Sequence, residues 1–131
     1  MSPSDATVLL VDDQKLVLDT TAMVLRRAGF TVLTAENGRA ALAECEAHAG
    51  PIHLALVDVV MPGMSGPQLR DVLAEQFPGI RVLFMSGYTS REIAFSGVVA
   101  DPQDFVNKPF RPKELVARVQ AALSQPRSAS V

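Results

Sequence analysis

The sequence predicts an α/β domain, a doubly wound parallel sheet of five strands covered by five helices. Two observations support this fold class. Short apolar runs of strand length alternate along the 131 residues with longer segments in which apolar residues recur at helical spacing. Most of these short runs are apolar at nearly every position, which is typical of strands that are buried on both faces between layers of helices.

Five short runs are assigned to strands, and each of them ends next to polar or turn residues. The predicted strands comprise residues 7–11, 31–35, 54–58, 81–85 and 104–107. Right-handed crossovers on both faces of the sheet give these strands the spatial order 2-1-3-4-5, the flavodoxin-like arrangement. In this order the first and third strands are neighbours, at the point where the strand order reverses.

Four segments combine helical spacing of apolar residues with recognisable ends. They comprise residues 14–28, 38–48, 65–77 and 112–123. Gly29 is a natural stop for the first helix, Ser65 suits the N-cap of the third, and Pro112 suits the first turn of the last. The predicted inner face of the first helix comprises Val17, Thr21, Val24 and Ala28, flanked by Leu18 and Leu25.

A further helix is expected between Thr89 and Val99, ahead of the last strand. Its second half, from Phe95 onward, contains glycine, serine and β-branched residues, which form helices poorly. We therefore expect this helix to be short or mobile, which would suit a switching element.

The chain length fits one domain. We expect the domain to span residues 7–123, with a disordered N-terminal segment over 1–6 and a C-terminal tail or linker over 124–131. Hydrophobic residues make up 48% of the sequence and charged residues 20%, which is typical of folded globular proteins rather than disordered chains.

Charge and composition disfavour several classes of function. The net charge of −2 gives no electrostatic basis for nucleic-acid binding by this domain. No apolar run approaches membrane-spanning length, and the N-terminal residues lack the features of a signal peptide. The single cysteine, Cys45, cannot form an internal disulfide, which suits a reducing compartment. We therefore expect a cytoplasmic domain that binds neither nucleic acid nor membrane.

Asp58 is the anomaly of the sequence, a lone carboxylate in the apolar run that begins at Leu54. An isolated ionised group in the middle of a buried strand is strongly unfavourable. The cost is acceptable if Asp58 lies at the carboxyl end of its strand, where open α/β sheets form their binding crevice. Asp12 and Asp13 end the first strand at the same edge, and Ser86 and Lys108 end the fourth and fifth.

Three converging carboxylates repel one another unless cations compensate them. Magnesium suits this edge, because it takes oxygen ligands and needs only one or two carboxylates besides water and phosphate oxygens. Lys108 supplies an ammonium group, Ser86 a hydroxyl donor, and Gly87 leaves room for an incoming group. Together these residues indicate a phosphoryl-accepting carboxylate with Asp58 as the nucleophile.

Each of these residues also has a purely structural interpretation. Asp12 and Asp13 alone would more often cap a helix, and Ser86 alone would be a turn hydroxyl. Phe105 could be an ordinary core residue, and Tyr88 a half-exposed loop aromatic. Three further residues are more simply explained by packing or surface roles, namely His48, His53 and Cys45.

The order of these motifs resembles the receiver domain of two-component response regulators. The resemblance rests on Asp12-Asp13, then Asp58 followed by Met61-Pro62-Gly63-Met64-Ser65-Gly66, then Ser86-Gly87, then Lys108-Pro109-Phe110. It covers the chain from about Thr7 to Leu123 and implies the CheY-like form of the flavodoxin-like fold.

By this resemblance, Asp58 accepts a phosphoryl group from a histidine kinase or a histidine phosphotransfer protein. Asp13, Asp58 and the backbone carbonyl of Val60 would ligate Mg²⁺, and Asp12 would reach the metal through water. Ser86, Gly87 and Lys108 would bind the phosphoryl group, and Phe105 together with Ser86 would form the switch. The resemblance implies a signalling module rather than a turnover enzyme.

Three finer expectations follow from the resemblance. Residues Val82 to Thr89 are similar to receivers attached to hybrid sensor kinases. Val60 and Tyr88 occupy positions that tune phosphoryl lifetime, and the apolar Val60 offers no polar group to orient water, so self-dephosphorylation should be slow to moderate. The face formed by the fourth helix, fifth strand and fifth helix would bind an effector or a second copy of the chain.

Two other functions use related chemistry or the same fold. A phosphatase of the haloacid-dehalogenase type also has an aspartyl nucleophile, but it requires an acid two residues later, where this chain has Val60. A flavin-binding electron carrier requires a phosphate-cradling loop after the first strand. This chain has Asp12 and Asp13 there, which repel phosphate unless a metal is present.

Overall fold

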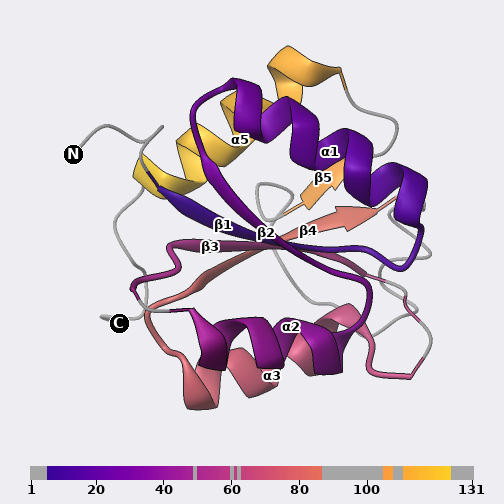
Figure 1. Cartoon of the computed structure of the whole chain (residues 1–131), viewed down its shortest axis with the longest axis vertical. Helices are drawn as coiled ribbons and strands as arrows, with labels where there is room; N and C mark the ends of the chain where they lie inside the picture. Colours follow the sequence, from indigo (N-terminus) through magenta and orange to yellow (C-terminus); the bar gives the residue numbers. More distant parts are fainter. Residues whose placement is uncertain are drawn as a thin grey trace.

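The structure, a computed structural model, describes residues 6–48, 50–59, 61, 63–86, 105–107 and 111–124, with Ser86, Phe105 and Asn107 described by their backbone alone. It is a three-layer arrangement in which a central sheet separates two pairs of helices (Figure 1). Helices α1 and α5 cover one face of the sheet, and α2 and α3 cover the other.

The sheet confirms the predicted strands and their order. All neighbouring strands run parallel, in the order β2-β1-β3-β4-β5. Their bounds are Thr7–Val11 for β1, Thr31–Ala35 for β2, Leu54–Asp58 for β3, Arg81–Ser86 for β4 and Phe105–Asn107 for β5. β4 is one residue longer than predicted, because the ladder between β4 and β5 continues to the pair Ser86 and Asn107.

Four of the predicted helices are confirmed, and none of their ends differs from the prediction by more than one residue. Their bounds are Lys15–Arg27 for α1, Gly38–Ala47 for α2, Gly66–Gln76 for α3 and Pro112–Ser124 for α5. The helix expected over 89–99 lies outside the described residues, so the expected number of five helices stays a prediction. Among the described helices, none is long and apolar enough to cross a membrane.

The buried face of α1 is rotated by about one residue relative to the prediction. The residues that are buried are Leu18, Thr21, Ala22 and Leu25. Val17, Val24 and Ala28, which the helical spacing places at the centre of the inner face, are only half-buried. The two leucines take the centre because they bury more apolar area than valine or alanine.

Alternate residues of the central strands fill two separate core layers. Val8, Leu10, Leu54 and Leu56 point toward α1 and α5, whereas the residues between them, such as Leu9 and Val57, point toward α2 and α3. All of these side chains are fully buried. The two-residue period of a strand therefore explains why β1 is apolar at every position from Val8 to Val11, and β3 from Leu54 to Val57, rather than at alternate positions.

The described residues extend one position beyond the predicted domain at each end. Ala6, which the sequence analysis assigns to a disordered segment, is 4% exposed. Its carbonyl accepts a hydrogen bond from the Thr31 amide at 3.1 Å, so it continues the contact between β1 and β2. At the other end, Ser124 belongs to α5 rather than to the tail.

The amino ends of the strands are joined by polar contacts around His53 and Arg81. The His53 Nδ1 atom accepts a hydrogen bond from the Thr7 amide at 3.0 Å, and the His53 amide donates to the Thr7 carbonyl at 2.9 Å. The Arg81 amide donates to the His53 carbonyl, and the Arg81 guanidinium donates to the Ala122 carbonyl of α5 at 2.7 Å. His53 thus has the structural role expected for it.

Cys45 is a buried core residue of α2, which agrees with the packing role expected for it. Burial, and then the neighbouring carboxylates of Glu44 and Glu46, raise the pKa of the Cys45 thiol above its ordinary value of 9.0. We therefore expect Ellman's reagent to label the native protein much more slowly than the urea-unfolded protein. Equal labelling rates in the two states would contradict this burial.

The same pKa shift predicts a loss of stability at alkaline pH. Because the folded state holds the thiol proton more tightly than the unfolded state, this contribution is complete below the unfolded-state pKa. It is lost as the pH rises through the raised pKa of the folded state. Urea titrations from pH 7 to 10 measure the slope, and Cys45→Ala, which has no thiol, should show a smaller decrease.

Candidate functional site

Three carboxylates meet at the carboxyl edge of the sheet, as the sequence predicts. Asp12 and Asp13 directly follow β1, and Asp58 is the last residue of β3, which pairs with β1. One oxygen atom from each of the three side chains lies within 4.8 Å of the other two. Asp12 is 0% exposed and Asp58 7% exposed, whereas Asp13 is open to solvent.

Asp12 is fixed by the backbone on both sides. Its amide donates to the Ala35 carbonyl of β2 at 3.2 Å, and its Oδ1 atom accepts a hydrogen bond from the Gln14 amide at 2.9 Å. The second contact closes an Asx turn between β1 and α1. Gln14 is the N-cap of α1 and makes no side-chain capping bond, so neither aspartate is the N-cap residue of this helix.

Asp58 lies at the end of a strand that is paired on both sides. Its Cα pairs with Met85 of β4, and the next amide, that of Val59, donates to the Met85 carbonyl at 3.0 Å. The carboxylate is therefore carried by a rigid backbone between two neighbouring strands. This position explains how a carboxylate can occur in an apolar run, because Asp58 is the last residue of its strand rather than a residue in the middle.

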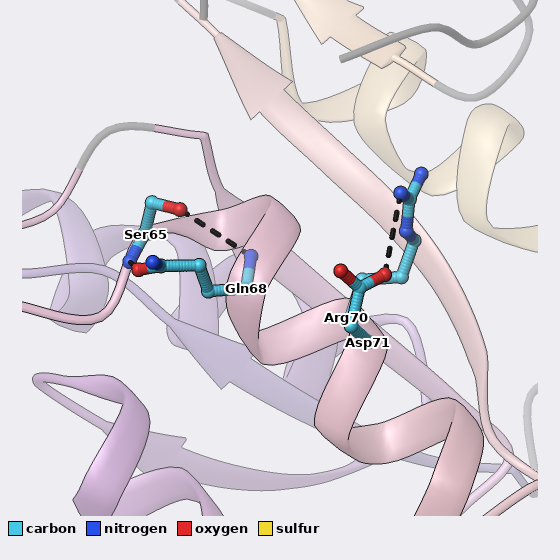
Figure 2. A network of polar contacts seen from close by, with 4 residues as sticks. All are labelled: Ser65, Gln68, Arg70 and Asp71. Carbon is cyan, nitrogen blue, oxygen red and sulfur yellow. Dashed lines mark hydrogen bonds and ion pairs between the residues drawn. The ribbon is translucent and has the colours of Figure 1, made fainter. Parts of the chain in front are cut away.

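A capping box fixes the start of α3, the helix that follows Asp58 in the sequence, and Figure 2 shows its two residues, Ser65 and Gln68. The Ser65 hydroxyl accepts a hydrogen bond from the Gln68 amide at 3.3 Å, and the Gln68 side chain accepts one from the Ser65 amide at 2.9 Å. This reciprocal pair is a capping box and confirms Ser65 as the N-cap. Sequence reasoning missed Gln68, although the spacing Ser-x-x-Gln ahead of an apolar helix is the signal that identifies such a box.

The structure describes the other predicted site residues only in part. The backbone of Ser86 ends β4, one position beyond the Met85 that pairs with Asp58, and Phe105 begins β5 opposite Phe84. Ser86 thus lies at the carboxyl end of β4, where the sequence places it, whereas Phe105 lies at the amino end of the short strand β5. Four predicted site residues lie outside the described part of the chain, namely Val60, Gly87, Tyr88 and Lys108.

Asp12, Asp13 and Asp58 together form what we call the acidic edge, and their donor atoms fit a hard divalent cation. All three groups offer carboxylate oxygens, which magnesium prefers over the nitrogen and sulfur ligands typical of zinc. Two of the carboxylates are buried and one is exposed, so a bound cation would keep access to water. Mg²⁺ commonly retains several water ligands, and the arrangement matches that requirement.

Comparison with known families gives one clear result. Residues 8–120 match the family model described as the response regulator receiver domain, which covers most of the chain. Receiver domains are signalling domains of two-component systems, and they generally bind Mg²⁺ at an acidic pocket and interact with histidine kinases or phosphotransfer proteins.

Individual relatives support the same family. The chain is 33% identical over 117 residues to the probable transcriptional regulatory protein TcrX of Mycobacterium tuberculosis, covering 89% of this chain and 49% of TcrX. It is 38% identical over 122 residues to the sensor kinase CckA of Brucella abortus, covering 92% of this chain and 13% of the kinase. The chain thus spans about half the length of TcrX and a small part of CckA.

Solved structures show the same fold. The receiver domain of the hybrid histidine kinase CckA has a TM-score of 0.74 and 35% identity, covering 91% of this chain and 100% of that domain. A response regulator from Thermotoga maritima has a TM-score of 0.78 and 29% identity, covering 92% of this chain and 99% of the regulator. The expected similarity to hybrid-kinase receivers is therefore found, alongside similarity to response regulators. With the family model, the fold and the acidic edge in agreement, the chain belongs to the response regulator receiver domain family of two-component signalling.

Proposed function

We propose that Asp58 is the phosphoacceptor of this receiver domain. The observation that carries the proposal is the convergence of Asp12, Asp13 and Asp58 at the end of two neighbouring strands. An oxygen of the Asp58 carboxylate attacks the phosphorus of a phosphohistidine, forming an acyl phosphate. The bond between phosphorus and the imidazole nitrogen breaks, and the donor histidine leaves with the electron pair of that bond.

The roles of the three acids differ because their positions differ. Asp58 lies on a strand paired on both sides, so its carboxylate is the best positioned of the three for a reaction that depends on alignment. Asp12 is fully buried, and one of its oxygens already accepts the Gln14 amide. Asp13 is exposed and lies at the turn into α1. These differences favour Asp58 as nucleophile and the other two as metal-binding groups.

We infer that Asp13, Asp58 and the backbone carbonyl of Val60 ligate Mg²⁺ directly and that Asp12 does so through water. Bound Mg²⁺ would neutralise the negative charge that the three acids and the transferred phosphoryl group share. Lys108, Ser86 and Gly87 would bind the phosphoryl oxygens. These assignments rest on the family motif, since Val60, Gly87 and Lys108 lie outside the described residues.

The donor would be a histidine kinase or a histidine phosphotransfer protein. Two large apolar side chains of α1, Leu16 and Met23, are 80% and 52% exposed. α1 begins directly after the acidic edge, so Leu16 in its first turn would supply an apolar contact beside the site for such a donor, and Met23 would extend this surface about two turns further along the helix. The receiver domain would span residues 7–123, either as a free regulator or as part of a longer signalling protein such as a hybrid kinase.

The output would be a change of binding surface rather than substrate turnover. Phosphorylation would draw Ser86 toward the phosphoryl group and turn Phe105 inward, changing the face formed by residues 89–99, β5 and α5. That face would bind an effector or a second copy of the chain. Val60 and Tyr88 would set a slow to moderate loss of the phosphoryl group, and a cytoplasmic location would suit this phosphorelay.

Metal removal tests the proposal directly. Incubation with acetyl phosphate and Mg²⁺ should add one phosphoryl group per chain, measured by intact-protein mass spectrometry under mild conditions. Addition of EDTA in excess over Mg²⁺ should abolish the modification, and a further excess of Mg²⁺ should restore it. Equal phosphorylation with and without EDTA would contradict the metal site, because the reaction would then not depend on charge neutralisation at the acidic edge.

A further inference from the structure

The first turn of α3 is packed directly against the backbone that carries Asp58. The Gly66 amide donates a hydrogen bond to the Val59 carbonyl at 2.9 Å. A Cβ atom on Gly66 would lie 2.5 Å from the Asp58 carbonyl oxygen and 2.9 Å from the Val59 Cα atom. No side chain fits between the two backbones, so the position of Gly66 and the position of Asp58 are linked.

The body of α3 is a rigid support for this contact. Leu69 and Leu73, one turn apart, are fully buried in the core layer shared with α2. On the side facing β4, the Arg70 guanidinium lies 5.8 Å from the centroid of the Phe84 ring. Arg70 also contacts the Asp71 carboxylate at 3.5 Å, as Figure 2 shows. The helix is thus anchored independently of the acidic edge.

The capping box joins this rigid helix to Gly66. Gly66 is the first residue of α3, and Ser65 and Gln68 on either side of it bond to each other's backbone. Without a cap, the amides of a first helical turn lose their partners and the turn frays. Fraying at this position would release the contact of Gly66 with Val59, and with it the backbone of Asp58.

We infer that Ser65 and Gln68 are positioning residues for the Asp58 carboxylate, acting through Gly66 and Val59. This inference rests on the proposed function of Asp58 as a metal-binding phosphoacceptor. Ligand groups of a metal site depend on the contacts that orient them, and loss of such a contact typically weakens metal binding about 10-fold to 100-fold. The capping box would therefore influence metal affinity although neither residue is a predicted metal ligand.

The test is the Mg²⁺ affinity of the whole chain, measured by calorimetry without any phosphodonor. Ser65→Ala removes the hydroxyl acceptor and should raise the dissociation constant about 10-fold. Ser65→Thr keeps an acceptor at the N-cap and should restore the affinity to within about 2-fold of the wild-type value. Gln68→Met removes the reciprocal acceptor and should weaken binding in the same direction as Ser65→Ala.

Ile52→Val is the matched control for general destabilisation. Ile52 is 8% exposed, lies in the same core layer as Leu69, and precedes β3 at the opposite end from Asp58. Loss of one methylene there should lower the urea midpoint about as much as loss of the cap, while leaving the Mg²⁺ dissociation constant unchanged.

The outcomes separate this inference from the proposed function. If Ser65→Ala weakens Mg²⁺ binding while Ser65→Thr and Ile52→Val do not, the positioning role is supported. If the wild type binds Mg²⁺ and Ser65→Ala binds it equally well, the inference is overturned and the proposed function stands. Should Ser65→Ala not fold, Gln68→Met decides by the same comparison. If the wild type itself binds no Mg²⁺, the metal site of the proposed function fails, and the inference fails with it.

Discussion

Asp58→Asn is expected to abolish phosphorylation by acetyl phosphate, lowering the rate at least about 1,000-fold, because the carboxamide lacks the anionic oxygen that attacks phosphorus. The substitution keeps the size of the side chain at a site that is only 7% exposed, so the packing of β3 should not change. It also removes one of three carboxylates that have oxygen atoms within 4.8 Å of one another, so the repulsion among them should decrease. Intact-protein mass spectrometry measures the modification, and urea unfolding measures the stability.

Asp19→Asn is the control for this experiment. It makes the same chemical change on the exposed face of α1, where Asp19 pairs with Lys15 at 3.3 Å. An exposed pair of this kind contributes little to stability, and phosphorylation should proceed as in the wild type. If Asp58→Asn were phosphorylated as fast as Asp19→Asn, the acceptor would be another residue and the assignment of Asp58 would be wrong.

Gly66→Ala should lower the free energy of unfolding by about 3 kcal/mol, at the upper end of the cost of overpacking. The new Cβ would meet the Asp58 carbonyl oxygen at 2.5 Å and the Val59 Cα at 2.9 Å. Both obstacles are backbone atoms at the end of a paired strand, so they cannot move aside as a flexible side chain could. Urea titration followed by circular dichroism gives the change in unfolding free energy.

Gly79→Ala provides the comparison for Gly66→Ala within the same chain. A Cβ on Gly79 would meet no atom within 4 Å, so the substitution should leave the stability within about 0.5 kcal/mol of the wild type. Equal stability of Gly66→Ala and Gly79→Ala would show that α3 can move away from β3, and would argue against a close contact at the site.

The architecture could be predicted from sequence because each strand has its own local signal. β1 and β3 each contain four consecutive apolar residues, and parallel strands place their carboxyl ends at one edge, so the convergence of Asp12 and Asp58 follows from residue order alone. The differences between the predicted and the observed fold are small and concern packing. Ala6 belongs to the fold because its carbonyl accepts the Thr31 amide, a contact that no pattern of residue types around Ala6 reports.

The details of the site are less predictable, for a physical reason. Gly66 must lack a side chain because α3 lies so close to the end of β3. The distance between the two elements is set by the packing of the whole helix through Leu69 and Leu73. Helix periodicity predicts which face of α3 is buried, but not how closely its first residue approaches Asp58. The capping role of Gln68, in contrast, follows from local spacing and is predictable.

The hydrogen bond between Arg81 and Ala122 allows β4 to couple α5 mechanically to the site. One end of this strand is tied to the last turn of α5 by a 2.7 Å hydrogen bond, and the other end carries Ser86 beside the edge of Asp58. An extended strand is already near its maximum length, so it transmits a pull along its axis with little slack. The C-terminal end of α5 is thus connected through the extended strand β4 to the acidic edge. A displacement of the end of α5 would therefore be transmitted along β4 to Met85, which pairs with Asp58 of β3.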